Sequence, residues 1–282
     1  MGGKHKYITM SGLGSKKHGR FGNQLLNYGL LKIYAAHYSL KTKTNPWIGQ
    51  YLFELRDPLI THKFPTLREA GIQSIKENRL LHFKEPPYVD MDLKGNSMKN
   101  MSAYAPYKQY FRSLFQPAPH LNRKLRKGRA KLQLMGKTVV GIHIRRGDYT
   151  KYTNHPKYVA VPTSWYVEWL SRIWPLLDRP VLFLASDDLN AVKADFSKFK
   201  PVTSADLISS FPATPRYNQL DPSFYPDFYF LTQCDLLAIS NSTFSFSASL
   251  LNERAKVFMR PGRQQKLVRY EPWKSSRKIR LR

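Results

Sequence analysis

The chain has 282 residues, of which 42% are apolar and 13% aromatic, enough for one large or two medium globular domains, so a largely disordered chain is excluded. Its 46 Lys and Arg residues against 19 Asp and Glu residues give a net charge of +27, which favours anionic partners without choosing among phosphates, anionic membranes and nucleic acid. The single cysteine, Cys234, excludes an intramolecular disulfide.

The chain begins with a pattern of strand, glycine-rich loop and helix. Residues 7–10 predict the strand, and residues 25–34 carry apolar side chains at helical spacing. The loop between them contains GRFGNQ, residues 19–24, in which Gly22 and Asn23 fall at the expected start of the helix. Free N–H groups at a helix start favour an anion. The alternative is an ordinary tight turn in which Asn23 is the N-cap residue.

The middle of the chain separates two regions of different composition. Residues 41–120 are rich in proline, aromatic and charged residues, and they predict only short helices. The basic stretch 121–136 follows and leads into an apolar strand. We place the domain boundary there, which divides the chain into residues 1–135 and 136–282.

From residue 138 onward, short apolar runs alternate with helical patterns. This alternation predicts a parallel β-sheet covered by helices on both faces. In such sheets, ligands bind at the carboxyl ends of the strands. The expected strands are residues 138–144, 181–185, 200–203, 236–240 and 255–259. The expected helices are residues 163–177, a helix beginning after Ser186, residues 226–234 and residues 244–253.

The first of these strands ends in the sequence HIRRGDY. Side chains alternate along a strand, so His143 and Arg145 share one face and can contact one ligand, while Arg146 points the other way. Arginine holds a diphosphate through forked, charge-assisted hydrogen bonds. We expect Arg146 to brace a carboxylate, with Asp148 as its candidate partner. The alternative is a purely structural ion pair between arginine and aspartate at the strand end. The Arg-Gly-Asp tripeptide is common by chance, so it does not indicate integrin binding.

The second strand ends in ASDD, which places Asp187 and Asp188 at the same edge of the predicted sheet. Paired carboxylates there could bind a metal ion, or they could cap the next helix and brace the site. We favour capping and bracing, because no further cluster of Asp, Glu or His completes a metal shell. We therefore expect no metal.

The last informative stretch is PDFYFLTQCDLLAISNSTFSFSASLLNE, residues 226–253. Asp227 opens a helix, while Ser242 and Thr243 follow a strand and begin the next helix. Hydroxyl groups and helix-start N–H groups together suit a diphosphate, although an N-capping cluster explains the same pattern. Residues 241–243 also form a glycosylation sequon, but a strand-to-helix turn is a poor acceptor site.

These four stretches, in this order, resemble the fucosyltransferase superfamily, which includes alpha-1,2-, alpha-1,6- and protein O-fucosyltransferases. HIRRGDY is similar to the HxRRGDY hallmark of the alpha-1,2 group, which this chain resembles most. GRFGNQ resembles the G-x-x-G-N-Q loop of the superfamily, and FLASDD resembles its strand with an Asp pair. ISNSTFSFSASLLN is similar to its C-terminal motif, except that Phe246 and Ser247 replace tryptophans, which puts the acceptor in doubt more than the donor. The resemblance spans residues 8–260.

The resemblance implies an α/β fold of two Rossmann-like lobes (GT-B type). Residues 1–135 would form the N-terminal lobe on the acceptor side, and residues 136–282 the C-terminal lobe, whose parallel sheet binds the nucleotide-sugar donor. The implied activity is an inverting transfer of fucose from GDP-fucose to a hydroxyl of a glycan acceptor, alpha-1,2-linked, with no cofactor and no required metal. Another nucleotide sugar is the alternative donor.

The resemblance also implies roles for individual residues. Arg145 would bind the diphosphate and oppose the charge of the leaving group. His143 and Asp227 would read the guanosine portion, and the loop with Gly22 and Asn23 would lie where donor and acceptor meet. The phosphate contacts would come from Ser242 and Thr243, and the supporting residues would be Arg146, Asp187 and Asp188. An inverting transfer also benefits from a base, for which the candidates near the expected cleft are Asp148, Asp187 and Asp188, and the sequence does not select one.

The positive charge leaves a competing class open, a basic protein that binds polyanions or nucleic acid. Local basic clusters lie at residues 123–131 and 274–282, but no nucleic-acid-binding motif is present, so we expect no nucleic-acid partner. Both clusters fit solvated surface or peripheral attachment to an anionic surface. The sequence contains no apolar run of about 18 residues and no signal peptide. We expect a cytoplasmic or membrane-peripheral protein, with a Golgi location open if an anchor segment was removed.

Overall fold

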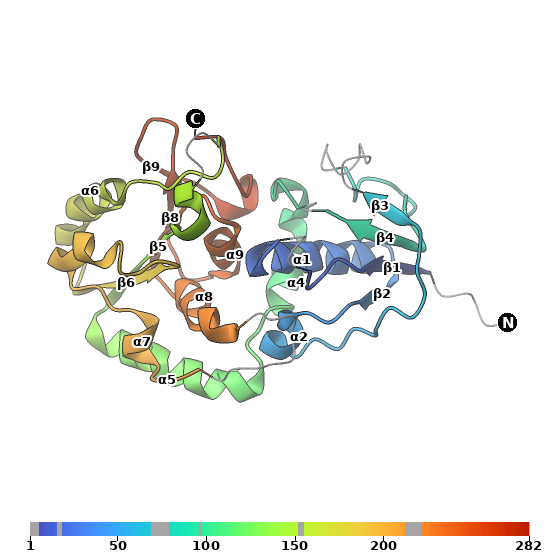
Figure 1. The fold of residues 1–282 in the computed structure, drawn as a ribbon, viewed down its shortest axis with the longest axis horizontal. Helices are drawn as coiled ribbons and strands as arrows, with labels where there is room; N and C mark the ends of the chain where they lie inside the picture. The colour runs from blue at the N-terminus through green and yellow to red at the C-terminus, as the bar shows by residue number, and fades with distance from the viewer. Residues whose placement is uncertain are drawn as a thin grey trace. The chain divides into compact units, whose positions relative to one another are not determined.

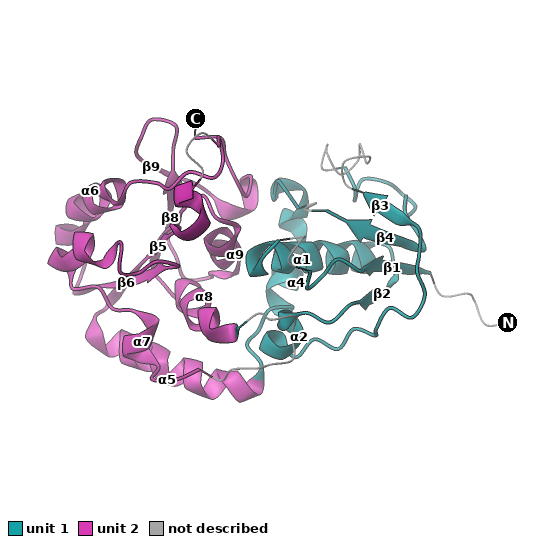
Figure 2. Cartoon of the chain, viewed as in Figure 1, with its two compact units in different colours: residues 1–118, 214–221 teal, residues 119–213, 222–282 magenta. Residues whose placement is uncertain are grey.

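The computed structural model describes residues 6–15, 19–68, 79–95, 98–151, 155–211 and 221–281. The chain divides into two compact units, shown in different colours in Figure 2. The first contains residues 1–118 and 214–221, and the second contains residues 119–213 and 222–282. Within the described ranges, none of the helices combines the length and the apolar character needed to cross a bilayer.

The first unit is built around a parallel sheet. Among the described residues, β1 (Tyr7–Met10), β2 (Lys41–Thr44), β3 (Thr66–Arg68) and β4 (Met91–Lys94) pair in the order β2-β1-β4-β3. The strand predicted at residues 7–10 is confirmed. The other three lie in the region for which the sequence predicted only short helices. Their sequences, KTKT, TLR and MDLK, are too short and too polar to indicate strands by themselves.

Helix α1 (Phe21–His37) supplies the core of this unit. It is buried on nearly every side, which explains why its apolar residues extend beyond a single stripe. Short helices complete the unit. They are α2 (Ile48–Phe53), a 3-10 helix over Ser102–Tyr107 and α4 (Lys108–Ser113).

The second unit has a mixed sheet with the order β6-β5-β7-β8-β9. Strands β5 (Thr138–Ile144), β6 (Pro180–Ser186), β7 (Leu236–Ala238) and β8 (Val257–Pro261) are parallel, while β9 (Leu267–Arg269) runs antiparallel to β8 at the edge. The predicted strands at 138–144, 181–185, 236–240 and 255–259 are therefore confirmed with small shifts in their ends. The strand expected at 200–203 is a single bridge between Val202 and Phe183.

Helices cover both faces of this sheet (Figure 1). Val140 and Ile142 of β5 pack with α6 (Thr163–Ile173), which a 3-10 helix over Trp174–Leu176 extends. On the other face, Phe183 of β6 contacts Phe230 of α8 (Tyr225–Leu231), with ring centroids 5.3 Å apart. α9 (Thr243–Leu251) follows β7. The helix expected after Ser186 is replaced by turns and a 3-10 helix over Lys193–Phe199, whose Phe196 and Phe199 enter the core.

The basic stretch that the sequence analysis placed at the end of the first domain forms α5 (Pro119–Met135) and lies in the second unit. Its buried residues follow helical spacing, and it packs against α7 (Ser204–Leu207) and α8. Because these buried residues pack against helices of the second unit, α5 belongs to that unit. The boundary between the two units therefore lies before α5, between residues 118 and 119, and not after residue 135. The buried residues are Leu121, Leu125, Gly128 and Leu132.

Candidate active site

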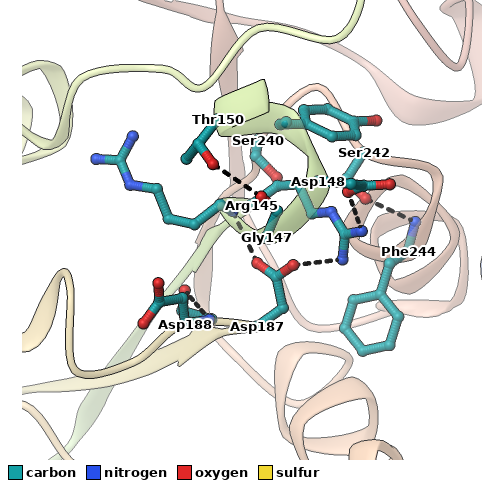
Figure 3. A network of polar contacts seen from close by, with 12 residues as sticks. Arg145, Gly147, Asp148, Thr150, Asp187, Asp188, Ser240, Ser242 and Phe244 are labelled. Carbon is teal, nitrogen blue, oxygen red and sulfur yellow. Dashed lines mark hydrogen bonds and ion pairs between the residues drawn. The ribbon is translucent and has the colours of Figure 1, made fainter. Parts of the chain in front are cut away.

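Three neighbouring strands of the second unit bring their polar ends together, as the sequence predicted. β5 lies between β6 and β7, with Ile144 opposite Ser186 and Ile142 opposite Ala238. The residues that follow these strands therefore meet at one edge of the sheet. Figure 3 shows the resulting network of contacts, which includes Arg145, Asp187 and Ser240.

Arg145 is the centre of this network. Its Nη1 lies 2.7 Å from Oδ2 of Asp187, its Nη2 is paired with Oδ1 of Asp148, and its guanidinium lies 5.3 Å from the ring centroid of Tyr149. Only 13% of the Arg145 side chain is exposed. The guanidinium is thus fixed in direction by two carboxylates and one aromatic face.

The proposed pairing of Arg146 with Asp148 is wrong. In the structure Asp148 pairs with Arg145, while Nη1 of Arg146 donates a hydrogen bond to the carbonyl of Val161 at 3.1 Å. The cause lies in the turn that follows the strand. Gly147 has a φ of +30°, and a 3-10 helix over Gly147–Lys151 brings Asp148 back toward Arg145.

Asp187 contacts the backbone of this turn as well as the guanidinium, as the bracing part of the interpretation expects. Its Oδ1 accepts a hydrogen bond from the backbone N–H of Arg146 at 2.7 Å. Asp188 acts locally: its Oδ1 accepts from the N–H of Ala191 at 3.3 Å. Among the described residues, no group of three or more His, Cys, Asp or Glu side chains could hold a metal ion.

His143 lies deeper than Arg145 and is only 3% exposed. Its Nδ1 shares a hydrogen bond of 2.8 Å with Oγ of Ser240, and its ring lies 5.1 Å from that of Phe244. Burial, and then the charge of Arg145, lower the pKa of His143 to about 3. The imidazole is therefore neutral across the physiological range, and any role of His143 in reading guanosine stays a prediction.

Ser242 and Thr243 occupy the start of α9. The backbone N–H of Phe244 donates to Oγ of Ser242 at 3.3 Å, so Ser242 is the N-cap residue, and the carbonyl of Thr243 accepts from Oγ of Ser247. The capping alternative is thus observed for Ser242. Contact of either hydroxyl with phosphate stays a prediction.

Asp227 lies in the first turn of α8, as expected. Burial raises the pKa of its carboxyl to about 6, and a hydrogen bond with the side chain of Ser204 opposes that rise. Asp227 can therefore carry a proton near neutral pH, which would let it donate as well as accept a hydrogen bond. Its role in reading guanosine stays a prediction.

Gly22 and Asn23 lie in the first turn of α1, in the first unit. The alternative in which Asn23 caps this helix is wrong, because Arg20 is the N-cap residue and its carbonyl accepts from the N–H of Asn23 at 2.9 Å. Gly19, at a φ of +105°, lets the chain turn into the helix one residue before Arg20, and a Cβ there would lie 2.2 Å from Nδ2 of Asn23. Contact of Gly22 or Asn23 with a donor stays a prediction.

Residues near the end of the sequence also contribute to this network, which the sequence pattern did not predict. Nζ of Lys278 donates a hydrogen bond to the hydroxyl of Tyr149 at 2.7 Å and lies 4.0 Å from the ring centroid of Tyr158. The basic cluster 274–282 was interpreted as solvated surface, which is wrong for Lys278. The sole sequence signal is the apolar alternation of Ile279 and Leu281 beside it.

An arginine and hydroxyl groups at the carboxyl ends of parallel strands are chemically suited to hold an anionic ligand. The family model for glycosyl transferase family 11 matches residues 14–269. The chain belongs to this family. Among curated protein sequences, none matches the chain significantly.

Solved structures with a similar fold include fucosyltransferases. One is the NodZ alpha-1,6-fucosyltransferase soaked with GDP-fucose, with a TM-score of 0.61 at 12% identity, covering 95% of this chain and 99% of that one. NodZ from Bradyrhizobium has a TM-score of 0.60 at 13% identity with the same coverage. A mutant of Arabidopsis thaliana FUT1 in complex with GDP has a TM-score of 0.56 at 11% identity, covering 100% of this chain and 75% of that one. At these identities the similarity establishes the α/β fold with parallel sheets.

Proposed function

We propose that the protein transfers fucose from GDP-fucose to a hydroxyl group of a glycan acceptor, with inversion at the anomeric carbon and an alpha-1,2 linkage. The observation that carries the proposal is the orientation of Arg145 by Asp148 and Asp187 at the carboxyl ends of β5 and β6. Membership of family 11 supports glycosyl transfer, and the GDP-fucose and GDP complexes of the similar structures support the donor. The HIRRGDY sequence supports the linkage.

In this reaction the acceptor oxygen attacks the anomeric carbon while the bond from that carbon to the diphosphate oxygen breaks. Negative charge grows on GDP and positive character on the sugar ring. A guanidinium that is already oriented and mostly withdrawn from water stabilises the departing diphosphate without reorganising. The helix-start N–H groups of α9 act in the same direction, so the proposal includes no divalent ion.

The acceptor proton needs a base, and the geometry favours Asp148 among the candidates. Asp148 exposes 36% of its side chain, whereas Asp187 exposes 25% and is also committed to the backbone N–H of Arg146. A diphosphate that binds Arg145 would therefore displace Asp148 more readily than Asp187. The displaced carboxylate could then accept the proton of the acceptor hydroxyl.

The test is a transfer assay with a panel of nucleotide sugars and an array of glycan acceptors, in EDTA, on the wild type, Arg145→Ala and Arg145→Lys. We expect GDP-fucose to be the donor that is used, and Arg145→Ala to lose about 100- to 1000-fold in rate with an unchanged circular dichroism spectrum. Arg145→Lys keeps the positive charge but lacks the forked pair of N–H donors, so its transfer rate should lie between those of the wild type and Arg145→Ala.

Arg172→Ala is the matched control, because Arg172 forms an exposed ion pair with Glu168 on α6 and should keep full activity. Turnover at the wild-type rate in folded Arg145→Ala protein would refute the role of Arg145. A requirement for a divalent ion, or preference for another nucleotide sugar, would refute those parts of the proposal.

A further inference from the structure

Residues 275–281 are fastened to the same edge of the sheet as the proposed donor site. The side chain of Asn241, in the turn between β7 and α9, makes a reciprocal pair of hydrogen bonds with the backbone of Ile279. Its Nδ2 donates to the Ile279 carbonyl at 2.8 Å, and its Oδ1 accepts from the Ile279 N–H at 3.1 Å. Asn241 is buried, so this pair is shielded from water.

Two further contacts fix the segment on either side of Ile279. Nη1 of the buried Arg260 donates to the carbonyl of Ser276 at 2.8 Å, and the N–H of Leu281 donates to the carbonyl of Pro156 at 2.8 Å. The residue between these tethers, Lys278, is therefore held at a defined position against the sheet edge.

The side chain of Lys278 enters a cage of two tyrosine rings. Its Nζ lies 4.0 Å from the ring centroid of Tyr158 and 5.3 Å from that of Tyr149, and it donates to the Tyr149 hydroxyl. The Tyr149 hydroxyl in turn donates to the carbonyl of Asn241 at 3.3 Å. Because the guanidinium of Arg145 also lies 5.3 Å from the Tyr149 ring, this one ring contacts both cations.

We propose that Lys278 is a second cationic contact of the donor site, where its ammonium donates to a phosphate oxygen of a nucleoside diphosphate held by Arg145. This inference rests on the proposed function. An ammonium has three N–H donors, and the Tyr149 hydroxyl accepts one of them. Aromatic faces attract the charge but replace the lost water only partly, so an incoming anion completes the contact.

The ionisation of Lys278 agrees with this geometry. Burial, followed by the charges of Arg277, Arg145 and Lys157, lowers the pKa of Lys278 to about 7, while Asp148 acts to raise it. A bound diphosphate adds negative charge and raises that pKa. At pH 7.5 the free protein should therefore take up a fraction of a proton when the anion binds, and affinity should fall as pH rises above 7.

The test is calorimetric titration of the wild type, Lys278→Met and Lys278→Arg with GDP, guanosine and pyrophosphate. We expect Lys278→Met to weaken GDP and pyrophosphate binding about tenfold or more, with guanosine unchanged, and Lys278→Arg to restore most of the loss. Titration in two buffers of different ionisation enthalpy at pH 7.5 should show proton uptake in the wild type and none in Lys278→Met. Lys274→Met, an exposed lysine of the same cluster, should behave as the wild type.

Two results would overturn the inference. One is unchanged GDP and pyrophosphate affinity in Lys278→Met. The other is an equal loss for guanosine and GDP with a lowered melting temperature, which indicates a structural role alone. Failure of the proposed function would give a different result. Wild-type protein that binds pyrophosphate but does not use GDP-fucose would refute GDP-fucose as the donor. The effect of Lys278→Met on pyrophosphate affinity would still decide the role of Lys278.

Discussion

Acid should destabilise the second unit through His143, and the structure sets the size of the effect. The perturbation is a fall in pH from 7.5 to 5, compared between the wild type and His143→Asn. The pKa of His143 is lowered from 6.5 to about 3 in the folded protein. Between these values the unfolded chain binds a proton at this position and the native state does not. The stabilisation is therefore complete above pH 6.5 and is lost progressively as pH falls toward 3.

One proton of this kind contributes about 1.4 kcal/mol per pH unit, so the wild type should lose about 2 kcal/mol relative to the variant by pH 5. Asparagine cannot titrate, and its amide can keep a hydrogen bond with Ser240. The loss of packing against Phe244 lowers the stability of the variant at every pH. The quantity to follow is therefore how the difference in unfolding free energy between the wild type and His143→Asn changes with pH.

The assay is urea denaturation at pH 7.5, 6.5, 5.5 and 5, followed by fluorescence and circular dichroism. His62→Asn is the control, because His62 is exposed and lies in the first unit. NMR of the imidazole nitrogens should show a neutral ring in the native protein at pH 5. A free-energy difference between wild type and His143→Asn that stays constant from pH 7.5 to 5 would refute the reasoning.

Three further predictions concern the turn, the base and the surface. Gly147→Ala should weaken GDP binding and stability, because a Cβ there would lie 2.2 Å from Oδ2 of Asp187 at a φ of +30°; calorimetry with GDP and a melting curve check this. Asp148→Asn should bind GDP more tightly yet transfer more slowly, seen as a lower KM with a lower kcat, and a parallel rise of both would contradict it. Charge reversal on the exposed face of α5 should weaken the free energy of binding to anionic vesicles by about 1 kcal/mol per residue, measured by co-sedimentation, and added salt should reduce the effect. Unchanged vesicle binding would show that α5 is not the contact. The reversed positions are Arg123, Lys124, Arg126 and Lys127, and the exposed Leu134 lies in the last turn of the same helix.

The parts of the fold that the sequence predicts are those with a strong local signal. VVGIHI and VLFLA are buried apolar runs, and they form the neighbouring strands β5 and β6 at nearly the predicted residues. KTKT becomes a strand because β1 lies beside it, with Tyr7 opposite Lys41. TLR and MDLK likewise depend on partners far away in the sequence. Pairing of this kind is a tertiary effect that a short polar segment does not reveal.

The same distinction explains the outcome at the site. Strand alternation holds through Ile144: Ile142 and Ile144 enter the core on the side of α6, while His143 contacts Phe244 of α9. It fails after Gly147, because a 3-10 turn has a different periodicity, and Asp148 therefore reaches Arg145. Lys278 contacts Tyr149 across 129 positions of sequence, and no local pattern connects them.

The degree of burial explains why His143 in β5 is neutral while Arg145, just after the strand, is charged and paired. His143 is buried and avoids the cost of a charge by remaining neutral. Arg145, two residues later, cannot lose its proton, so its charge is offset by Asp148 and Asp187. Under the proposed function, a diphosphate at this position would replace carboxylate oxygens that already surround the guanidinium. Its binding to Arg145 would then be an exchange of anions, whose free energy is smaller than that of a new ion pair. Lys278 makes its described contacts with a hydroxyl and aromatic faces, so its contact with the diphosphate would be a new ion pair. Because burial lowers the pKa of Lys278 to about 7, part of the free energy of that contact would be used to protonate the amine above pH 7.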